Sequence, residues 1–308
     1  MSGDESAWLT VLAAILGGAL RVSTPFLFVS LGETLTERSG RVNLGLEGTL
    51  VFGAMSGYAV AFHADSAWAG VLAAGAFGTV FGLVHGLVCS LPRVNDVAFG
   101  IALMTLGLGL AFFFGKGYVQ PTAPRLPEIA LGGWSDSPAL QSALQINVLL
   151  LIGIACALAL AWALRSTRWG LVLRTVGDSA NAARALGFPV TAVRTCATAA
   201  GGFMAGVGGS FLSLYYPGSW NEALSSGQGV MAVALVIFAR WHPMGCVWAA
   251  LLFGGTGAIG PALQAIGVQQ GYHLWNAAPY VLTLFVMVAT SSARRSMAGA
   301  PGELSLTR

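Results

Sequence analysis

Long apolar segments separated by short polar loops occupy almost the whole chain. A helix needs about 20 apolar residues to cross the hydrocarbon core of a bilayer. The pattern therefore predicts an all-α integral membrane protein, a polytopic bundle of about nine transmembrane helices in a single transmembrane domain, residues 1–308. The expected helices are 8–30, 43–62, 67–91, 95–115, 145–164, 195–216, 225–240, 244–264 and 275–292.

Three parts of the chain depart from the simple pattern. The second expected helix (43–62) and the seventh (225–240) are short or amphipathic, which leaves a re-entrant course open for both. The tail, residues 298–308, is expected to be disordered.

Composition supports the membrane class and excludes others. Of 308 residues, 56% are hydrophobic and only 9% are charged, whereas soluble domains carry about a quarter charged residues. Cysteines and histidines are scattered, so the sequence predicts no metal site. The single lysine, Lys116, lies outside any Walker A loop, and no catalytic motif is visible. Basic residues form no face outside 165–194, which argues against nucleic-acid binding.

Basic residues are distributed so that they set an orientation. Cytoplasmic loops of membrane proteins carry an excess of arginine and lysine. With the N-terminus outside and the C-terminus in the cytoplasm, the loops on the outer side carry almost no net positive charge. The expected cytoplasmic side then holds Arg38, Arg41, Arg93, the loop 165–194, Arg240, Arg294 and Arg295.

Three of the expected helices carry a small residue at every fourth position. Such stripes let helix backbones approach closely inside a membrane. We therefore expect tight packing within the bundle, and the stripes do not by themselves indicate dimerisation. They are Gly45-Thr49-Gly53-Gly57-Ala61, Ala74-Gly78-Gly82-Gly86 and Thr198-Gly202-Gly206-Ser210.

The loop 165–194 is the most strongly basic part of the chain, with five arginines and one acid, Asp178. Inside it, Asp178 or Ser179 can cap a helix, which Gly187 and Pro189 then end. A helix of about two turns is unstable alone and must pack against something. One interpretation is a connector lying on lipid headgroups. The other is a coupling helix seated in the cleft of a cytoplasmic partner.

A second polar stretch, residues 31–48, leads into the second expected helix. Its glycines permit an irregular backbone, so that Asn43 and Glu47 can face inward as a gate or a fixed polar cluster. The alternative is a solvated interfacial loop. Asp96 opens the fourth expected helix and is a candidate N-cap. The candidate residues of a translocation path or gate are Glu33, Glu37, Asn43, Glu47, Asn95 and Asp96.

Ionisable residues are scarce inside the expected spans, where Arg21 and Glu47 are the only candidates. Charge within a bilayer is costly, so such residues are candidates for function. Carriers driven by protons or sodium ions usually need buried carboxylates. Their scarcity indicates that transport energy enters from elsewhere and that the substrate is neutral or weakly charged.

Three segments resemble a known family. They are GETLTERSGRVNLGLEG (32–48), GLVLRTVGDSANAARALGFPV (170–190) and GQGVMAVALVIFARWHPMG (227–245). With them, residues 15–290 resemble the permease subunits of bacterial ABC importers, in the branch of ribose and branched-chain amino-acid permeases. Within that branch the chain is similar to the nucleoside subgroup, which works with a basic membrane lipoprotein.

The resemblance also covers a motif that couples such permeases to their ATPase. Asn181-Ala182-Ala183 followed by Gly187 is similar to the E-A-A-x-x-x-G motif, with Asn in place of Glu. The ion pair that this Glu would form is therefore in doubt, and Asp178 and Arg184 can supply charges instead. The ATPase-coupling residues implied are Asp178, Asn181, Ala182, Ala183, Arg184 and Gly187.

The resemblance implies a transport subunit rather than an enzyme, with a vitamin B12/ribose importer-like permease fold, in a bacterial plasma (inner) membrane. It implies a cytoplasmic ABC ATPase that binds ATP and Mg, a second related permease in a heterodimer, and an external substrate-binding lipoprotein. No cofactor is expected in this chain. Nucleosides are the expected substrates. The alternatives are a sugar or branched-chain amino-acid permease, an ATP-independent channel or facilitator, and an intramembrane enzyme.

Overall fold

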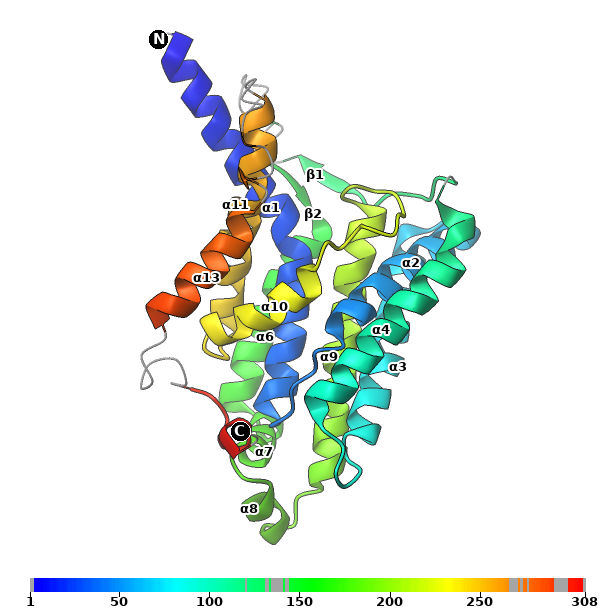
Figure 1. Cartoon of the computed structure of the whole chain (residues 1–308), viewed down its shortest axis with the longest axis vertical. Helices are drawn as coiled ribbons and strands as arrows, with labels where there is room; N and C mark the ends of the chain where they lie inside the picture. Colours follow the sequence, from blue (N-terminus) through cyan, green and yellow to red (C-terminus); the bar gives the residue numbers. More distant parts are fainter. Residues whose placement is uncertain are drawn as a thin grey trace.

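The computed structural model describes residues 3–119, 121–130, 133, 141, 144–265, 271, 274–275, 277–290 and 299–306, and helices dominate it (Figure 1). A two-stranded antiparallel sheet pairs β1 (Glu128–Ala130) with β2 (Gln145–Asn147). The helices are α1 (Gly3–Arg38), α2 (Leu46–Ala64), α3 (Ala67–Val88), α4 (Asp96–Gly115), the 3-10 helix η1 (Lys116–Tyr118), α6 (Val148–Ser166), α7 (Arg168–Asp178), α8 (Ala180–Ala185), α9 (Val190–Leu214), α10 (Gln228–Phe238), α11 (Pro243–Ala265), α13 (Ala278–Thr290) and α14 (Gly302–Leu306).

Each of the expected transmembrane segments contains a helix of the structure. Within the described residues, six helices are long and apolar enough to cross a membrane, namely α1 from Leu12, α3, α4 with η1, α6, α9 and α11 to Gln264. Helix α2 is not among them, and α10 and α13 are shorter, at 11 and 13 residues. The chain is therefore a multi-pass helical bundle in which α10, at 11 residues, is too short to span a bilayer.

Helix α1 is longer than the sequence predicted. The expected helix ended at residue 30, whereas α1 continues to Arg38. The charges of Glu33 and Glu37 do not end the helix, because both side chains are buried, at 0% and 3% exposure. The helix ends before Gly40, whose φ of +83° lies in the left-handed region that glycine tolerates.

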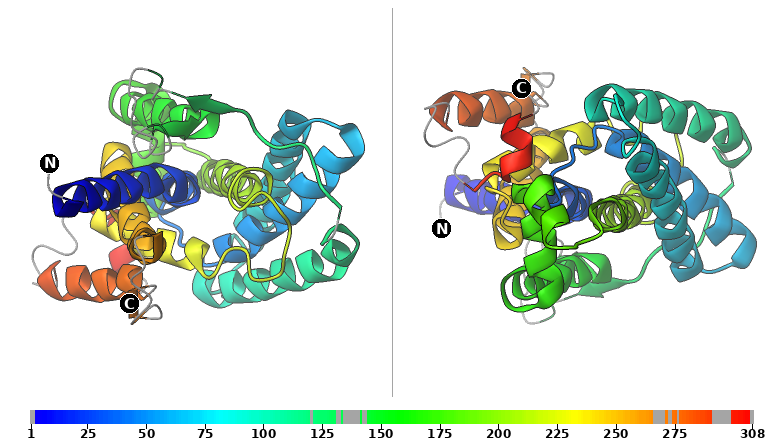
Figure 2. Two further views of the ribbon diagram at one scale, coloured as in Figure 1. Left: turned by 90° about the horizontal axis from the view of Figure 1, so that it is seen from above. Right: turned by 90° about the horizontal axis from the view of Figure 1, so that it is seen from below.

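Helix α9 lies at the centre of the bundle. It contacts α1 on one side and α2 and α3 on the other, as both end-on views show (Figure 2). In its most apolar 18-residue stretch, 83% of the residues are buried, against 22% for α4 and 28% for α6. Helices α4 and α6 therefore form the periphery, where their apolar side chains would meet lipid.

Glycines bring α3 and α9 into backbone contact, as the small-residue stripes predicted. A Cβ built on Gly78 would overlap the carbonyl oxygen of Gly202, and one on Gly82 would overlap that of Thr198. A Cβ on Gly206 would overlap the carbonyl oxygen of Ala74 in the same way. Side chains larger than hydrogen are excluded at these points, and the prediction of tight packing within the bundle is confirmed.

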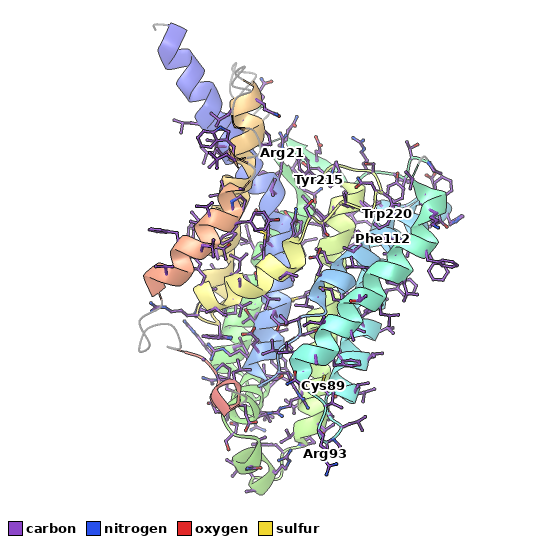
Figure 3. The ribbon with its side chains drawn as sticks, viewed as in Figure 1. Arg21, Cys89, Arg93, Phe112, Tyr215 and Trp220 are labelled. Atoms are coloured by element: carbon purple, nitrogen blue, oxygen red, sulfur yellow. The ribbon has the colours of Figure 1, made fainter. Side chains whose placement is uncertain are left out.

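The two ends of the bundle differ in character. The sheet, Arg21 and Tyr215 lie toward one end, and Cys89 and Arg93 lie toward the other (Figure 3). This second end carries α7, α8 and α14 and is called the α8 end below (Figure 1). The C-terminal tail does not fit the expectation of disorder, because residues 302–306 form α14 and Glu303 bonds to the rest of the chain.

Candidate functional site

A buried polar cluster, the α1-end cluster, is formed by Glu33, Glu37, Asn43 and Trp241. The backbone N–H of Asn43 donates to Glu33 Oε1 at 2.7 Å, and the indole Nε1–H of Trp241 donates to Glu37 Oε2. All four side chains are at most 3% exposed. Glu33 and Glu37 stand one helical turn apart, so both face the same side of α1. Their burial excludes the solvated-loop interpretation of these residues.

Glu47 belongs to α2, but its side chain binds the N-terminus of another helix, α10. Its Oε2 accepts hydrogen bonds from the backbone N–H groups of Gly229 at 2.6 Å and Val230 at 3.3 Å. Its Oε1 accepts from the Ser225 hydroxyl at 2.5 Å. A carboxylate at a helix N-terminus satisfies free N–H groups and complements the helix dipole. Glu47, on α2, thus fixes the start of the short α10 inside the bundle.

Gln228 is the first residue of α10 and offers an unused polar group beside this cap. Its Oε1 is buried and has no hydrogen-bond partner among the described residues. Buried polar atoms are normally satisfied, so an unsatisfied amide oxygen indicates a place for water or a ligand. Sequence reasoning did not single out Gln228.

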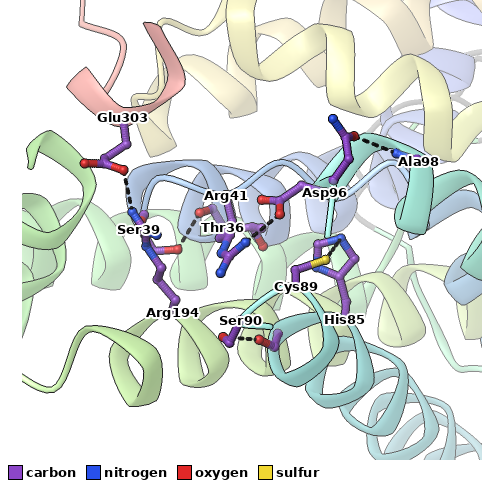
Figure 4. Close-up of polar contacts among 12 residues, drawn as sticks. Thr36, Ser39, Arg41, His85, Cys89, Ser90, Asp96, Ala98, Arg194 and Glu303 are labelled. Atoms are coloured by element: carbon purple, nitrogen blue, oxygen red, sulfur yellow. Dashed lines mark hydrogen bonds and ion pairs between the residues drawn. The ribbon is translucent and has the colours of Figure 1, made fainter. Parts of the chain in front are cut away.

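An ion pair joins the loop after α1 to the start of α4. Arg41 Nη1 lies 2.5 Å from Asp96 Oδ1, and His85 and Cys89 lie beside the pair (Figure 4). Burial, and to a lesser extent the nearby Asp96, raises the pKa of the Cys89 thiol to about 12, so Cys89 is a neutral packing residue.

The N-cap of α4 is the residue before Asp96. Asn95 Oδ1 accepts from the backbone N–H of Ala98 at 3.0 Å. The predicted cap at Asp96 is therefore wrong, because its carboxylate is engaged by Arg41 instead.

The expected short helix in the basic loop is present as α8. Ser179 is its N-cap, and the Ser179 hydroxyl oxygen accepts from the N–H of Ala182 at 3.3 Å. Gly187 adopts φ +82°, the left-handed conformation that ends a helix. Asp178 is the last residue of α7 and does not cap α8.

Helix α8 rests on a small apolar contact and leaves its other face free. Ala180 and Ala183 are buried with Val176 and Val190. The exposed face carries Asn181, Ala182, Arg184, Ala185 and Leu186, with Leu186 exposed by 67%. Arg184 Nη1 donates to Asn181 Oδ1 at 3.0 Å, so these two polar side chains pair within the helix.

The C-terminal helix holds the N-terminus of α8 in place. Glu303 Oε1 accepts from the backbone N–H of Ala180 at 2.8 Å, and Glu303 Oε2 accepts from Arg194 Nη2 at 3.1 Å. Arg194 Nε also donates to the carbonyl of Ser39 at 3.0 Å, just beyond α1 (Figure 4). The tail, α8, α9 and the end of α1 therefore meet in one polar junction.

The structure brings some predicted site residues together and separates others. Glu33, Glu37 and Asn43 share the α1-end cluster, Glu47 lies apart at α10, and Asn95 and Asp96 lie at α4. The coupling residues lie on α8 or at its ends. The partners Trp241, Ser225, Arg194 and Glu303 were missed, because they come from distant parts of the sequence.

The fold and these clusters suit a membrane transport protein, and a family comparison agrees. The family described as the branched-chain amino acid transport system permease component matches residues 8–291. The chain belongs to this family. It is thus a multi-pass membrane permease, and its relatives are transport components rather than enzymes.

Three permeases are similar to this chain over most of their length. The guanosine ABC transporter permease protein NupQ of Bacillus subtilis is 31% identical over 90% of this chain and 92% of its own. The nucleoside ABC transporter permease protein NupC of Lactococcus lactis is 29% identical over 91% and 92%. The putative glucose ABC transporter permease protein TsgC13 of Haloferax volcanii is 31% identical over 84% and 80%.

The buried acidic residues are engaged by donors of the protein itself. Among the described residues, no group of three or more His, Cys, Asp or Glu side chains is arranged to hold a metal ion. The buried carboxylates instead accept hydrogen bonds from the protein's own donors, such as the N–H groups of Asn43 and Gly229. The polar groups in the permease thus fix its helices in place.

Proposed function

We propose that this permease is the transmembrane subunit of an ATP-binding-cassette importer and that it translocates nucleosides. The observation that carries the proposal is the 31% identity to the guanosine permease NupQ over 90% of the chain. Similarity to the putative glucose permease TsgC13 makes simple sugars the second candidate substrate class. The family description keeps branched-chain amino acids as a third.

The buried carboxylates support a neutral substrate. Glu47 already occupies the positive end of α10, where a substrate anion would otherwise bind. Glu33 and Glu37 are also engaged by internal donors. A polar, uncharged solute can instead use amide and hydroxyl groups such as the free Oε1 of Gln228.

The energy for transport would come from partner chains. A cytoplasmic ABC ATPase would bind ATP and Mg, and a second related permease would complete a heterodimer. An extracytoplasmic lipoprotein would deliver the substrate. The relatives support this composition because their names identify them as ABC transporter permeases.

The proposed topology follows from the distribution of arginines. The permease domain, residues 1–308, would lie in a bacterial inner membrane with its N-terminus outside and its C-terminus in the cytoplasm. The α8 end is then cytoplasmic. Nine helical segments in the B12/ribose importer-like arrangement would include short, incompletely spanning helices such as α10.

Helix α8 has a surface suited to a cytoplasmic partner. Its exposed face and Gly187 would sit in a cleft of the ATPase, and its buried face contacts α7 and α9. From α7 the contacts continue to α1, since a Cβ on Gly177 would overlap the carbonyl oxygen of Arg38. Movement of α8 would therefore be passed directly to the end of α1 and to the α1-end cluster.

The α1-end cluster and the Glu47 cap would act as the gate elements. Arg38 Nε donates to the carbonyl of Trp241 at 3.0 Å, which ties the end of α1 to the turn after α10. The other end of α10 is fixed by Glu47. A shift of α1 would thus move the C-terminal end of α10 through the turn at Trp241. The N-terminus of α10 would stay bound to α2 through Glu47.

Two substitutions at Gly187 test the coupling role of α8. A Cβ at Gly187 would meet nothing within 4 Å, so a larger residue acts through backbone strain and not through a clash. We expect Gly187→Val to abolish ATP-linked nucleoside uptake, whereas Gly187→Asn, which tolerates the left-handed conformation, retains most of it. Arg184→Glu should also abolish uptake. Membrane insertion should be normal in all three, and equal uptake by the two Gly187 variants would contradict the role.

Co-purification tests the importer proposal itself. The chain would be expressed with its chromosomal neighbours and isolated in mild detergent. Recovery of an ATPase and a second permease would support the importer. Isolation of the chain alone, together with ATP-independent nucleoside flux in liposomes, would favour a channel or facilitator.

A further inference from the structure

A basic pocket lies at the α8 end, where the ends of α1, α6 and α7 meet the turn between α10 and α11. Its polar lining consists of the three arginines Arg38, Arg165 and Arg174 together with His242, over apolar side chains that include Leu164 and Trp241. Three arginines from separate elements around one pocket concentrate positive electrostatic potential there.

A hydrogen bond within the described part of the chain holds one nitrogen of each of these arginines. Arg165 Nη2 donates to His242 Nε2 at 2.5 Å, and Arg38 Nε donates to the Trp241 carbonyl at 3.0 Å. Arg174 Nε donates to the Gly170 carbonyl at 3.3 Å. No acceptor within the described part of the chain engages the terminal nitrogens of Arg38 or Arg174.

Among the described residues, no salt bridge neutralises the arginines of the pocket. The described residues form two ion pairs, Arg41–Asp96 and Arg194–Glu303, and neither involves a pocket residue. The acids near the pocket are Asp178, whose charge acts on Arg38, and Glu37, which accepts from the Trp241 indole.

An exposed apolar surface of α6 leads into the pocket. Leu158, Trp162 and Arg165 are spaced i, i+4 and i+7, so they lie on one face of the helix. Leu158 is 55% exposed and Trp162 is 65% exposed, on a helix that is mostly unburied. Trp169, at the start of α7, is 45% exposed. Exposed tryptophans beside arginines are typical of the level of lipid headgroups.

We propose that this pocket binds the phosphate headgroup of an anionic phospholipid whose acyl chains lie along the Leu158–Trp162 face of α6. Arginine guanidinium groups bind phosphate oxygens through paired hydrogen bonds. Basic pockets between transmembrane helices bind anionic headgroups in this way. The apolar face of α6 favours a lipid over a soluble phosphate. This face starts beside Arg165 and offers the acyl chains of a lipid a surface to lie against.

Lipid binding by the purified full-length chain tests the proposal. Native mass spectrometry in detergent would compare phosphatidylglycerol with phosphatidylcholine of the same acyl chains. We expect wild-type protein to retain phosphatidylglycerol preferentially. Arg165→Gln with Arg174→Gln should weaken that binding roughly tenfold or more, because each basic residue near an anionic headgroup contributes substantially.

A matched double variant controls for loss of charge. Arg93 and Arg168 are exposed at the same end and do not line the pocket, so Arg93→Gln with Arg168→Gln removes the same charge elsewhere. This control should bind phosphatidylglycerol as wild type does. If the pocket double variant does not fold, single Arg174→Gln takes its place.

Three results would overturn the proposal. The first is equal binding of the two lipids by wild-type protein. The second is an equal loss of binding in the pocket and control variants. The third is stabilisation by inorganic phosphate that matches stabilisation by phosphatidylglycerol in a thermal assay, since that would identify a soluble anion as the ligand.

Discussion

Arg194, near the start of α9, donates from Nη2 to Glu303 of the C-terminal helix at 3.1 Å. Both side chains are largely buried, with 10% and 21% exposure. Glu303 also accepts the N–H of Ala180, so the tail contributes directly to the N-terminus of α8. A segment that looks dispensable in the sequence is thus part of the proposed coupling surface.

Glu303→Ala is expected to loosen α8 without unfolding the bundle. Loss of a charge-assisted hydrogen bond costs about 1–2 kcal/mol locally, which corresponds to roughly tenfold faster exchange of the protected amides. Hydrogen–deuterium exchange across residues 178–188 would measure this. Glu222→Ala, an exposed acid outside this junction, is the control. Unchanged exchange in Glu303→Ala would show that the tail does not hold α8.

Gly78→Val is expected to destabilise the bundle severely, because its side chain would overlap the backbone of Gly202. Overpacking typically costs about 1–3 kcal/mol, and more where the neighbour is backbone that cannot move aside. The measurement is the midpoint of thermal aggregation in detergent. Gly109→Val is the matched control, since a Cβ at Gly109 meets nothing within 4 Å. Equal midpoints for the two variants would be inconsistent with the packing described.

Glu47→Ala is expected to lower both thermal stability and nucleoside uptake. It leaves the N–H groups of Gly229 and Val230 and the Ser225 hydroxyl without their acceptor, at about 1–3 kcal/mol for each buried group. Glu47→Gln keeps one acceptor oxygen and should be intermediate. Ser225→Ala removes a single bond and should have the mildest effect. Any other order of the three variants would argue against the capping role.

His242 is expected to make stability depend on pH. Partial burial, and then the charges of Arg165 and Arg38, lower the pKa of His242, so the folded protein binds this proton more weakly than the unfolded chain. The stability gained from neutral His242 is complete above the ordinary value of about 6.5 and is lost as the pH falls through the lowered folded value.

The matching experiment compares thermal midpoints of wild type and His242→Gln across that pH range. Wild type should lose stability on acidification, because protonated His242 can no longer accept from Arg165. The variant should lose less. Parallel pH profiles for the two proteins would rule out His242 as the group responsible.

Sequence patterns were most informative where the structure depends on neighbours along the chain. Apolar run length located the helices within the expected transmembrane segments, but it did not predict α7 or α14. Ser179 and Gly187 act locally as cap and terminator, so α8 was predictable to within a residue or two. The small-residue stripes predicted close contact, although not that α3 and α9 would be the partners.

Sequence patterns were misleading where a charged residue has a distant partner. Because Glu33 and Glu37 are charged, the sequence suggested a loop at their positions. In the structure both lie buried in α1, where the backbone of Asn43 and the indole of Trp241 donate hydrogen bonds to them. Glu303 lies in a tail that was expected to be disordered, yet its carboxylate accepts hydrogen bonds from Arg194 and from the backbone N–H of Ala180. Such pairings depend on how helices are brought together, and a single sequence does not contain that information.

The backbone contact between α3 and α9 limits which parts of the permease can change shape. Where two backbones touch through glycines, no layer of side chains remains that could rotate or slide between them. We therefore expect α3 and α9 to move together as one rigid body. We would therefore expect rearrangement during a transport cycle to involve shorter elements, such as the 11-residue α10, whose start is bound by Glu47 and whose end is tied to α1 through the Trp241 carbonyl.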